Sequence, residues 1–174
     1  MADGRTDTFR FTEADLIQAA RLFAGRNLSR PKVIVSYLCL WFFSLILFTY
    51  LLTGSTSPSA ITSDPGRILG LSILPFALIL IWTLWLIPAL ARRNFRLQRS
   101  LHGDFSYGWS TDKLMVSTEY GSFDMPWSHF HGWAENDKML LLFESDRLYR
   151  VIPKRVLSPE QQTDLRQHLD RVGV

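Results

Sequence analysis

Aromatic and imidazole side chains alternate along one short segment of the chain, at Trp127, His129, His131 and Trp133. Alternate residues of a regular strand share one face, so a continuous strand here would place the two imidazoles side by side. Two histidines at that spacing can bind one metal ion, but a structural or catalytic zinc ion takes three or four protein ligands. The other histidines, His102 and His168, form no recognisable ligand motif with this pair. We therefore favour the alternative in which Trp127, Phe130 and Trp133 are buried and the histidines are exposed, and we predict no metal and no other cofactor.

Two adjacent cations, Lys154 and Arg155, form a second candidate site after Pro153. They follow the last expected strand and precede the final helix. Two cations at such a turn can contact anionic lipid head groups or a protein partner. The alternative is a solvated turn in which both cations pair with nearby Asp or Glu side chains.

Four arginines recur at helical spacing directly after an apolar run, at Arg92, Arg93, Arg96 and Arg99. Each cation beside an anionic leaflet contributes on the order of 1 kcal/mol, so we predict head-group contact, with a docking surface as the alternative. Residues 100–174 hold eight Lys and Arg against eleven Asp and Glu. The positive charge is therefore concentrated at the membrane edges, which is a topology signal, and we predict no nucleic-acid partner.

No motif of an enzyme is present in the sequence. The chain lacks a nucleophile elbow, a phosphate-binding glycine loop, a zinc-protease helix and a dinucleotide fingerprint. We therefore predict that the protein is not an enzyme.

Two long uncharged runs, Val33–Thr53 and Ile68–Leu90, dominate the sequence. A helix needs about 20 apolar residues to cross a bilayer, and both runs reach that length. The connecting loop, Gly54–Arg67, holds one Asp and one Arg, whereas the outer flanks of both runs carry several Lys and Arg. Because cytoplasmic flanks carry the excess of positive charge, we expect both termini in the cytoplasm and the loop outside.

The remaining sequence predicts three parts. Residues 1–32 should form a cytoplasmic strand and an amphipathic helix at about 13–25, capped by Thr12. Residues 33–90 should form the transmembrane hairpin with the outer loop 54–67. Residues 91–174 should form a cytoplasmic domain of short antiparallel strands, closing toward a barrel or sandwich, and a final helix that Ser158, Pro159 and Gln161 initiate.

The expected strands are defined by alternating apolar residues and by turn signals at intervals of about ten residues. Their ranges are Phe105–Ser110, Lys113–Thr118, Ser122–Met125, Trp127–Ala134, Lys138–Glu144 and Arg147–Ile152. The apolar positions expected to be buried are Leu114, Val116, Phe123, Trp127, Leu140, Leu142, Leu148, Ile152, Leu165 and Leu169.

A meander of six or seven strands followed by one helix is the outline of a PH-like domain, and several short motifs resemble a family. Met125-Pro126-Trp127-Ser128 is followed by Phe130, then by Leu140–Phe143 and by Val151-Ile152-Pro153-Lys154-Arg155. This pattern resembles the YcxB-like family of bacterial membrane proteins. The resemblance implies two membrane helices followed by a cytoplasmic PH-like domain. His129 stands where the family has Asp, and Gly132-Trp133 replaces its Lys-Val. The family implies no defined biochemical activity.

These observations lead to a functional hypothesis without catalysis. The chain is expected to be a multi-pass protein of the bacterial plasma (inner) membrane that contacts lipids. Its cytoplasmic domain would bind a protein partner or form a homo-oligomer, acting as an interaction or scaffold module. The aromatic residues Tyr107, Trp109 and Trp133 are the predicted partner surface. The alternative is an accessory subunit of a membrane transport or export system, or an immunity-type protein.

Overall fold

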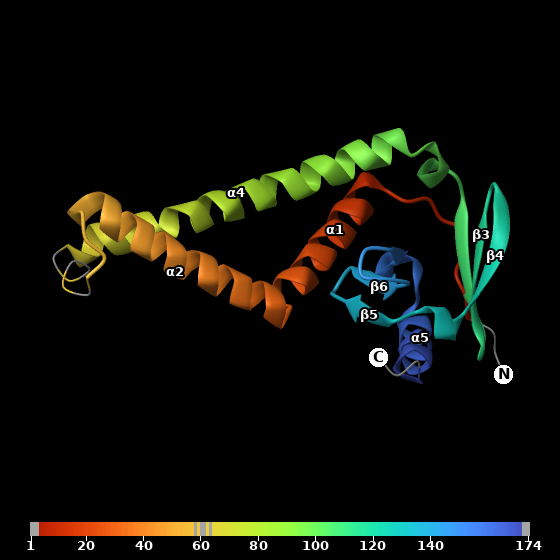
Figure 1. Ribbon diagram of the computed structural model, residues 1–174. Helices are drawn as coiled ribbons and strands as arrows, with labels where there is room; N and C mark the ends of the chain where they lie inside the picture. Colours follow the sequence, from red (N-terminus) through yellow and green to blue (C-terminus); the bar gives the residue numbers. More distant parts are fainter. Residues whose placement is uncertain (1–3, 58, 60–61, 63, 172–174) are drawn as a thin grey trace. The chain divides into compact units, whose positions relative to one another are not determined.

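The computed structural model describes residues 4–57, 59, 62 and 64–171 (Figure 1). Part of the expected outer loop, at positions 58, 60–61 and 63, lies outside the described residues. The chain divides into two compact units. One, the sheet unit, comprises the chain up to Ala24 together with the chain from Pro88 onward, and the other, the hairpin unit, is Gly25–Ile87.

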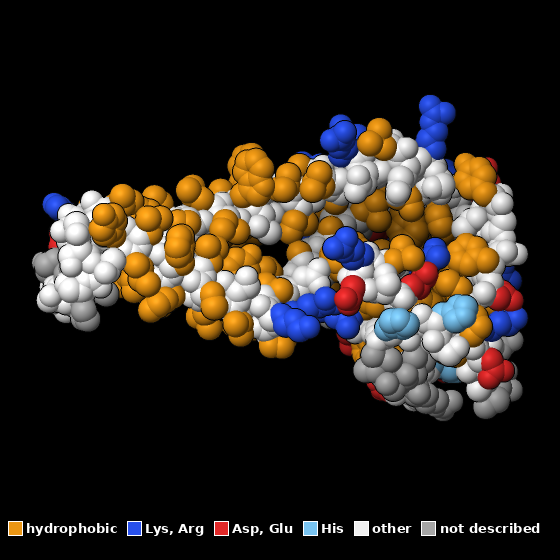
Figure 2. Space-filling model, viewed as in Figure 1, with side chains coloured by type: hydrophobic (Ala, Val, Ile, Leu, Met, Phe, Trp, Pro, Cys, Tyr) orange, Lys and Arg blue, Asp and Glu red, His pale blue; other side chains and the backbone are white. Residues whose placement is uncertain are grey.

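The hairpin unit is built from α2 (Pro31–Thr53) and most of α4 (Pro65–Leu97). Both helices are long and apolar enough to span a membrane. Figure 2 shows apolar side chains over the visible face of both helices, as expected for surfaces that meet lipid. The helices contact through small polar positions, since Ser44 Oγ donates to the Ser72 carbonyl at 3.2 Å and both residues are buried. The two predicted apolar helices are therefore present, with α4 continuing past the expected end at Leu90.

Among the described residues, the sheet unit contains seven strands in two antiparallel sheets (Figure 1). The four-stranded sheet has the order β1 (Gly4–Arg5), β2 (Phe105–Trp109), β3 (Lys113–Thr118) and β4 (Gly121–Pro126). The three-stranded sheet has the order β5 (Gly132–Glu135), β6 (Met139–Phe143) and β7 (Tyr149–Pro153). The final helix is α5 (Pro159–Arg171), and short 3₁₀ turns occupy Arg99–His102 (η1), Trp127–His129 (η2) and Lys154–Val156 (η3). The antiparallel meander and its terminal helix are confirmed, but the barrel does not close.

Strand β6 is buried along its whole length because both of its faces are covered. Leu140 and Leu142 join the main core with α5 and the four-stranded sheet. Leu141 and Phe143 face the other way and pack against Ala19 of α1 (Glu13–Leu28). This double coverage explains the uninterrupted apolar run, which resembles that of a central strand covered on both sides.

The N-terminal segment completes the core from the other end of the sequence. Phe9 and Phe11 are buried against β2, and Phe9 exchanges backbone hydrogen bonds of 2.8 Å with Phe105 in both directions. Strand β1 pairs with β2, placing Gly4 opposite Trp109. The Trp109 indole lies directly against Gly4, so a Cβ at this position would lie 2.1 Å from Trp109 Cε2. Only glycine therefore permits this close approach.

Local capping chemistry starts both helices of the sheet unit where the sequence predicted. Ser158 N donates to Gln161 Oε1 at 2.8 Å, and Gln161 N donates to Ser158 Oγ at 3.2 Å. Thr12 and Asp15 exchange the same reciprocal pair of bonds at the start of α1. These capping boxes satisfy backbone donors that the first helical turn leaves free.

Two parts of the expected sheet are wrong. The single strand expected over Trp127–Ala134 is instead η2 followed by the short strand β5, because the Phe130 amide bonds back to the Trp127 carbonyl at 3.0 Å. Of the expected core positions, Phe123 is 39 % exposed and Leu148 is 54 % exposed. The other eight expected core residues are buried.

Candidate membrane and partner contacts

The aromatic and histidine segment does not present a row of imidazoles. Turn η2 interrupts the alternation, so Trp127 and Phe130 are buried while His129 and His131 are exposed. The Trp127 indole donates to the Ser110 carbonyl at 2.9 Å, which joins η2 to the β2–β3 turn. Within the described part of the chain, no three His, Cys, Asp or Glu residues gather in a group that could hold a metal ion. The favoured alternative is therefore correct for Trp127, Phe130 and both histidines, whereas Trp133 is only partly buried.

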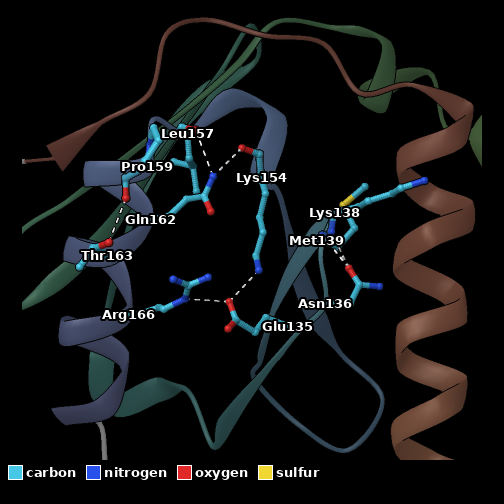
Figure 3. Close-up of polar contacts among 10 residues, drawn as sticks. All are labelled: Glu135, Asn136, Lys138, Met139, Lys154, Leu157, Pro159, Gln162, Thr163 and Arg166. Carbon is cyan, nitrogen blue, oxygen red and sulfur yellow. Dashed lines mark hydrogen bonds and ion pairs between the residues drawn. The ribbon is translucent and has the colours of Figure 1, made fainter.

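Lys154 lies in a charged junction between the three-stranded sheet and α5 (Figure 3). Its Nζ is 2.9 Å from Glu135 Oε2, and the same oxygen accepts from Arg166 Nε at 3.0 Å. The Lys154 side chain is only 11 % exposed. Desolvation by itself would raise the pKa of Glu135, but the hydrogen bonds from Lys154 and Arg166 outweigh it and lower that pKa. One carboxylate thus joins β5, η3 and α5.

Amide side chains fix the backbone around this junction, as Figure 3 shows. Gln162 Nε2 donates to the carbonyls of Lys154 and Leu157, each at 3.2 Å. On the opposite side, Asn136 Oδ1 accepts from the backbone amides of Lys138 and Met139, at 3.0 and 2.8 Å. The Lys154 amide also donates to the Lys138 carbonyl at 2.9 Å, so η3 is held between the β5–β6 turn and the first turns of α5.

Arg155 pairs with a residue 140 positions earlier in the sequence. Its guanidinium contacts both carboxylate oxygens of Asp15, with Nη2 at 2.7 Å from Oδ2 and Nε at 3.2 Å from Oδ1. The Asp15 side chain is 7 % exposed, whereas that of Arg155 is 47 % exposed. Burial favours a higher pKa for Asp15, but bonds from Arg155 and Thr12 together hold that pKa below its usual value. Arg155 Nη2 also donates to the Arg10 carbonyl at 2.8 Å.

Both cations of the Pro153-Lys154-Arg155 segment are therefore paired with carboxylates of the chain itself. The pairing agrees with the alternative of cations neutralised by Asp and Glu, but the Lys154 side chain is largely buried and not solvated. A groove of about 370 Å³ lies beside the two pairs, and its lining includes Asp15, Lys138, Lys154, Arg155 and Gln162. Lipid or partner contact at Lys154 and Arg155 stays a prediction.

The four arginines after the second apolar run are all exposed. Arg92, Arg93 and Arg96 lie in the last turns of α4, while Arg99 begins η1. Arg92 Nε is 2.9 Å from Glu13 Oε1 at the start of α1. Their predicted contact with head groups stays a prediction.

The predicted aromatic partner surface is wrong for two of its three residues. Tyr107 is 3 % exposed and Trp109 is 1 % exposed, because the N-terminal segment and α5 cover the inner face of β2. Tyr107 Oη donates to the Val151 carbonyl at 3.1 Å, joining the two sheets, and its burial raises its pKa. Trp133 is partly buried and packs against the same core.

Sequence reasoning missed an exposed apolar site at the edge strand β4. Five of its six residues are exposed, including Phe123. Phe123 lies opposite the buried Val116 in the pairing with β3, so the two side chains share one face of the sheet. The Arg150 guanidinium lies 5.0 Å from the centre of its ring and pairs with Glu144. The edge position of β4 would have been the signal, but it depends on which strands pair.

Together these features define a class of protein: a pair of long apolar helices joined to a small antiparallel sheet domain with a terminal helix. The family model of YcxB-like proteins matches residues 109–169, from the end of β2 into α5. The match includes the Trp127, Leu140–Phe143 and Lys154-Arg155 motifs and confirms the YcxB-like resemblance over this segment. No curated protein and no solved structure matches the chain.

Proposed function

We propose that the protein is a bacterial inner-membrane interaction module that binds a protein partner, or a second copy of itself, through its sheet unit. The observation that carries this proposal is the edge strand β4, whose outer edge pairs with no other described strand. An edge strand offers free backbone N–H and C=O groups to another chain. Phe123, which is 39 % exposed, adds apolar surface at the same edge.

The rest of the sheet unit supports a binding role and not a catalytic one. Several of its ionisable groups form structural ion pairs, such as those of Lys154 and Arg155. Such pairs fix elements relative to one another, and they perturb pKa values without implying catalysis. The proposal therefore assigns the protein no enzymatic activity.

A photoreactive benzoylphenylalanine in place of Phe123 tests the proposal in the full chain expressed in bacterial membranes. We expect an adduct at twice the mass of the chain for self-association, or at another defined mass for a partner. The same replacement at Tyr120 is the control, because Tyr120 is 71 % exposed but lies in the turn before β4. Crosslinking at position 120 that equals or exceeds that at 123 would reject β4 as the binding edge.

The proposed orientation places both termini in the cytoplasm. Its support is the charge bias of the sequence. Arg26, Arg30 and Lys32 precede the uncharged run of α2, and Arg92, Arg93, Arg96 and Arg99 follow the uncharged run of α4. The chain with Ser59→Cys should then react with an impermeant thiol reagent added outside intact spheroplasts. Cys39 lies within the α2 span, so Cys39→Ser in the same chain removes its background. Labelling only after the membrane is opened would reverse the orientation.

A further inference from the structure

Several cations of the sheet unit are neutralised by carboxylates of the chain. The ion pairs are Arg10–Asp104, Lys113–Asp124, Arg150–Glu144, Lys154–Glu135, Arg155–Asp15 and Arg166–Glu135. Arg93 and Arg96 have no acidic partner among the residues that the structure describes. Unlike other exposed cations without such a partner, such as Arg21, they lie close together on α4, directly after the uncharged run. Two guanidinium groups on consecutive turns of one helix give a local positive charge that attracts anions.

The two arginines line a notch on the surface of α4. Its volume is about 470 Å³, and its lining consists of Ala89, Arg92, Arg93, Arg96 and Leu97. Ala89 lies one helical turn before Arg92 and Arg93, on the same side of α4. Its small side chain leaves open space beside the arginine side chains. The notch therefore combines guanidinium groups with an apolar residue toward the membrane-spanning part of the helix.

We propose that this notch binds the phosphate of an anionic phospholipid, with Arg93 and Arg96 as the principal donors. A guanidinium presents its N–H groups in a fork that matches phosphate oxygens in bidentate fashion. The site lies on the helix that continues from the uncharged run, so a lipid head group can reach it without leaving the bilayer. The proposal rests on the membrane placement in the proposed function and goes beyond it by assigning a lipid class.

Arg92 has a different part in the site because Glu13 already holds it. The pair of 2.9 Å joins the first residue of α1 to the notch, so the Glu13 carboxylate offsets one of the three positive charges. Glu13→Gln removes this offset and should strengthen retention of an anionic lipid several-fold. Lipid affinity at the notch would therefore depend on the Glu13–Arg92 pair at the start of α1.

The test uses the full chain in nanodiscs of phosphatidylcholine with a minor fraction of phosphatidylglycerol, and native mass spectrometry measures the lipid that stays bound. We expect phosphatidylglycerol to be retained in preference to phosphatidylcholine. The double variant Arg93→Gln/Arg96→Gln should lower this preference roughly 30-fold, which corresponds to on the order of 1 kcal/mol for each cation. The matched control is Arg21→Gln/Arg147→Gln, because both residues are exposed cations of the sheet unit and neither lines the notch.

The outcomes separate this site from the proposed function. Equal lipid preference in the wild type and the notch variant, or an equal loss in the control, would overturn the assignment while leaving the membrane placement intact. Displacement of the bound lipid by millimolar inorganic phosphate would show that a soluble anion is the ligand and would also overturn it. A chain that does not insert into nanodiscs would reject the membrane placement and the lipid site together.

Discussion

Replacing Trp109 with alanine is expected to lower the free energy of unfolding of the sheet unit by about 3–5 kcal/mol. Trp109 is 1 % exposed and packs across Gly4, and its Nε1 donates to Asp164 Oδ2 at 2.7 Å. The indole therefore connects β1, β2 and α5 at once. Its removal leaves a cavity and also deprives Asp164 of its indole donor. Pulse proteolysis of the full chain in detergent micelles, over a range of urea concentrations, measures the loss.

Two further variants separate packing from the hydrogen bond and from a general effect of tryptophan loss. Trp109→Phe retains most of the apolar contact and loses the bond to Asp164, so we expect a cost of about 1–2 kcal/mol. Trp85→Ala removes the same side chain from α4, where it is 80 % exposed and lies outside the sheet unit. It should leave the proteolysis midpoint unchanged. An unchanged midpoint for Trp109→Ala would show that the indole does not stabilise the sheet unit.

The elements that local chemistry determines could be predicted from the sequence. The spans follow from uncharged length, and the helix starts at Thr12 and Ser158 follow from capping residues with polar partners three positions later. Strand β3 occupies its expected range Lys113–Thr118 because its alternating pattern lies between two clear turns. Each of these signals is contained within a few neighbouring residues.

The elements that depend on distant parts of the chain could not be predicted in the same way. The alternation of Tyr107 and Trp109 is equally consistent with a core face and with an exposed aromatic patch. The choice depends on the N-terminal segment, which reaches β2 from about 100 positions away, as in the bond from Tyr107 N to Thr6 Oγ1. Likewise, the sequence permits several acidic partners for Arg155, and only the docking of α1 selects Asp15.

The exposed side of the sheet shows the same limit. Phe123 and Leu148 have the residue types of a core, and their spacing favoured burial. Phe123 lies on the edge strand β4, and the Arg150 guanidinium lies over its ring. Leu148 lies in the turn between β6 and β7, where its carbonyl accepts from the amides of Glu144 and Ser145. Period-two patterns identify which residues share a face, but they do not tell where two sheets diverge.

The ion pair between Asp15 and Arg155 should make the largest polar contribution to the stability of the sheet unit. Asp15→Ala is expected to lower the free energy of unfolding by about 2–3 kcal/mol, combining the loss of the capping box with the loss of Arg155's partner. The estimate is at the low end for a buried pair because Arg155 is half exposed and regains water. Urea unfolding of the full chain in micelles, followed by near-ultraviolet circular dichroism, measures the change.

Matched variants distinguish the charge of Asp15 from its capping role. Asp15→Asn keeps an oxygen that can accept from Thr12 N, so it should cost less than Asp15→Ala. Asp124→Ala removes the carboxylate of an exposed pair with Lys113 and should change stability by no more than about 0.5 kcal/mol. Equal effects of Asp15→Ala and Asp124→Ala would show that the buried pair has no special role.

The contribution of the Asp15 charge should disappear in acid. The folded-state pKa of Asp15 lies below its usual value of 3.8, so the unfolded chain binds the proton more readily and stability rises with pH through this range. The contribution is fully present above the unfolded pKa and is lost as the pH falls through the folded one. The difference in unfolding free energy between the wild type and Asp15→Asn should therefore stay constant from pH 7 to about pH 5 and shrink toward pH 3. A difference that is unchanged at pH 3 would mean that Asp15 acts through its shape and its hydrogen bond with Thr12, and not through the ionic interaction of its carboxylate with Arg155.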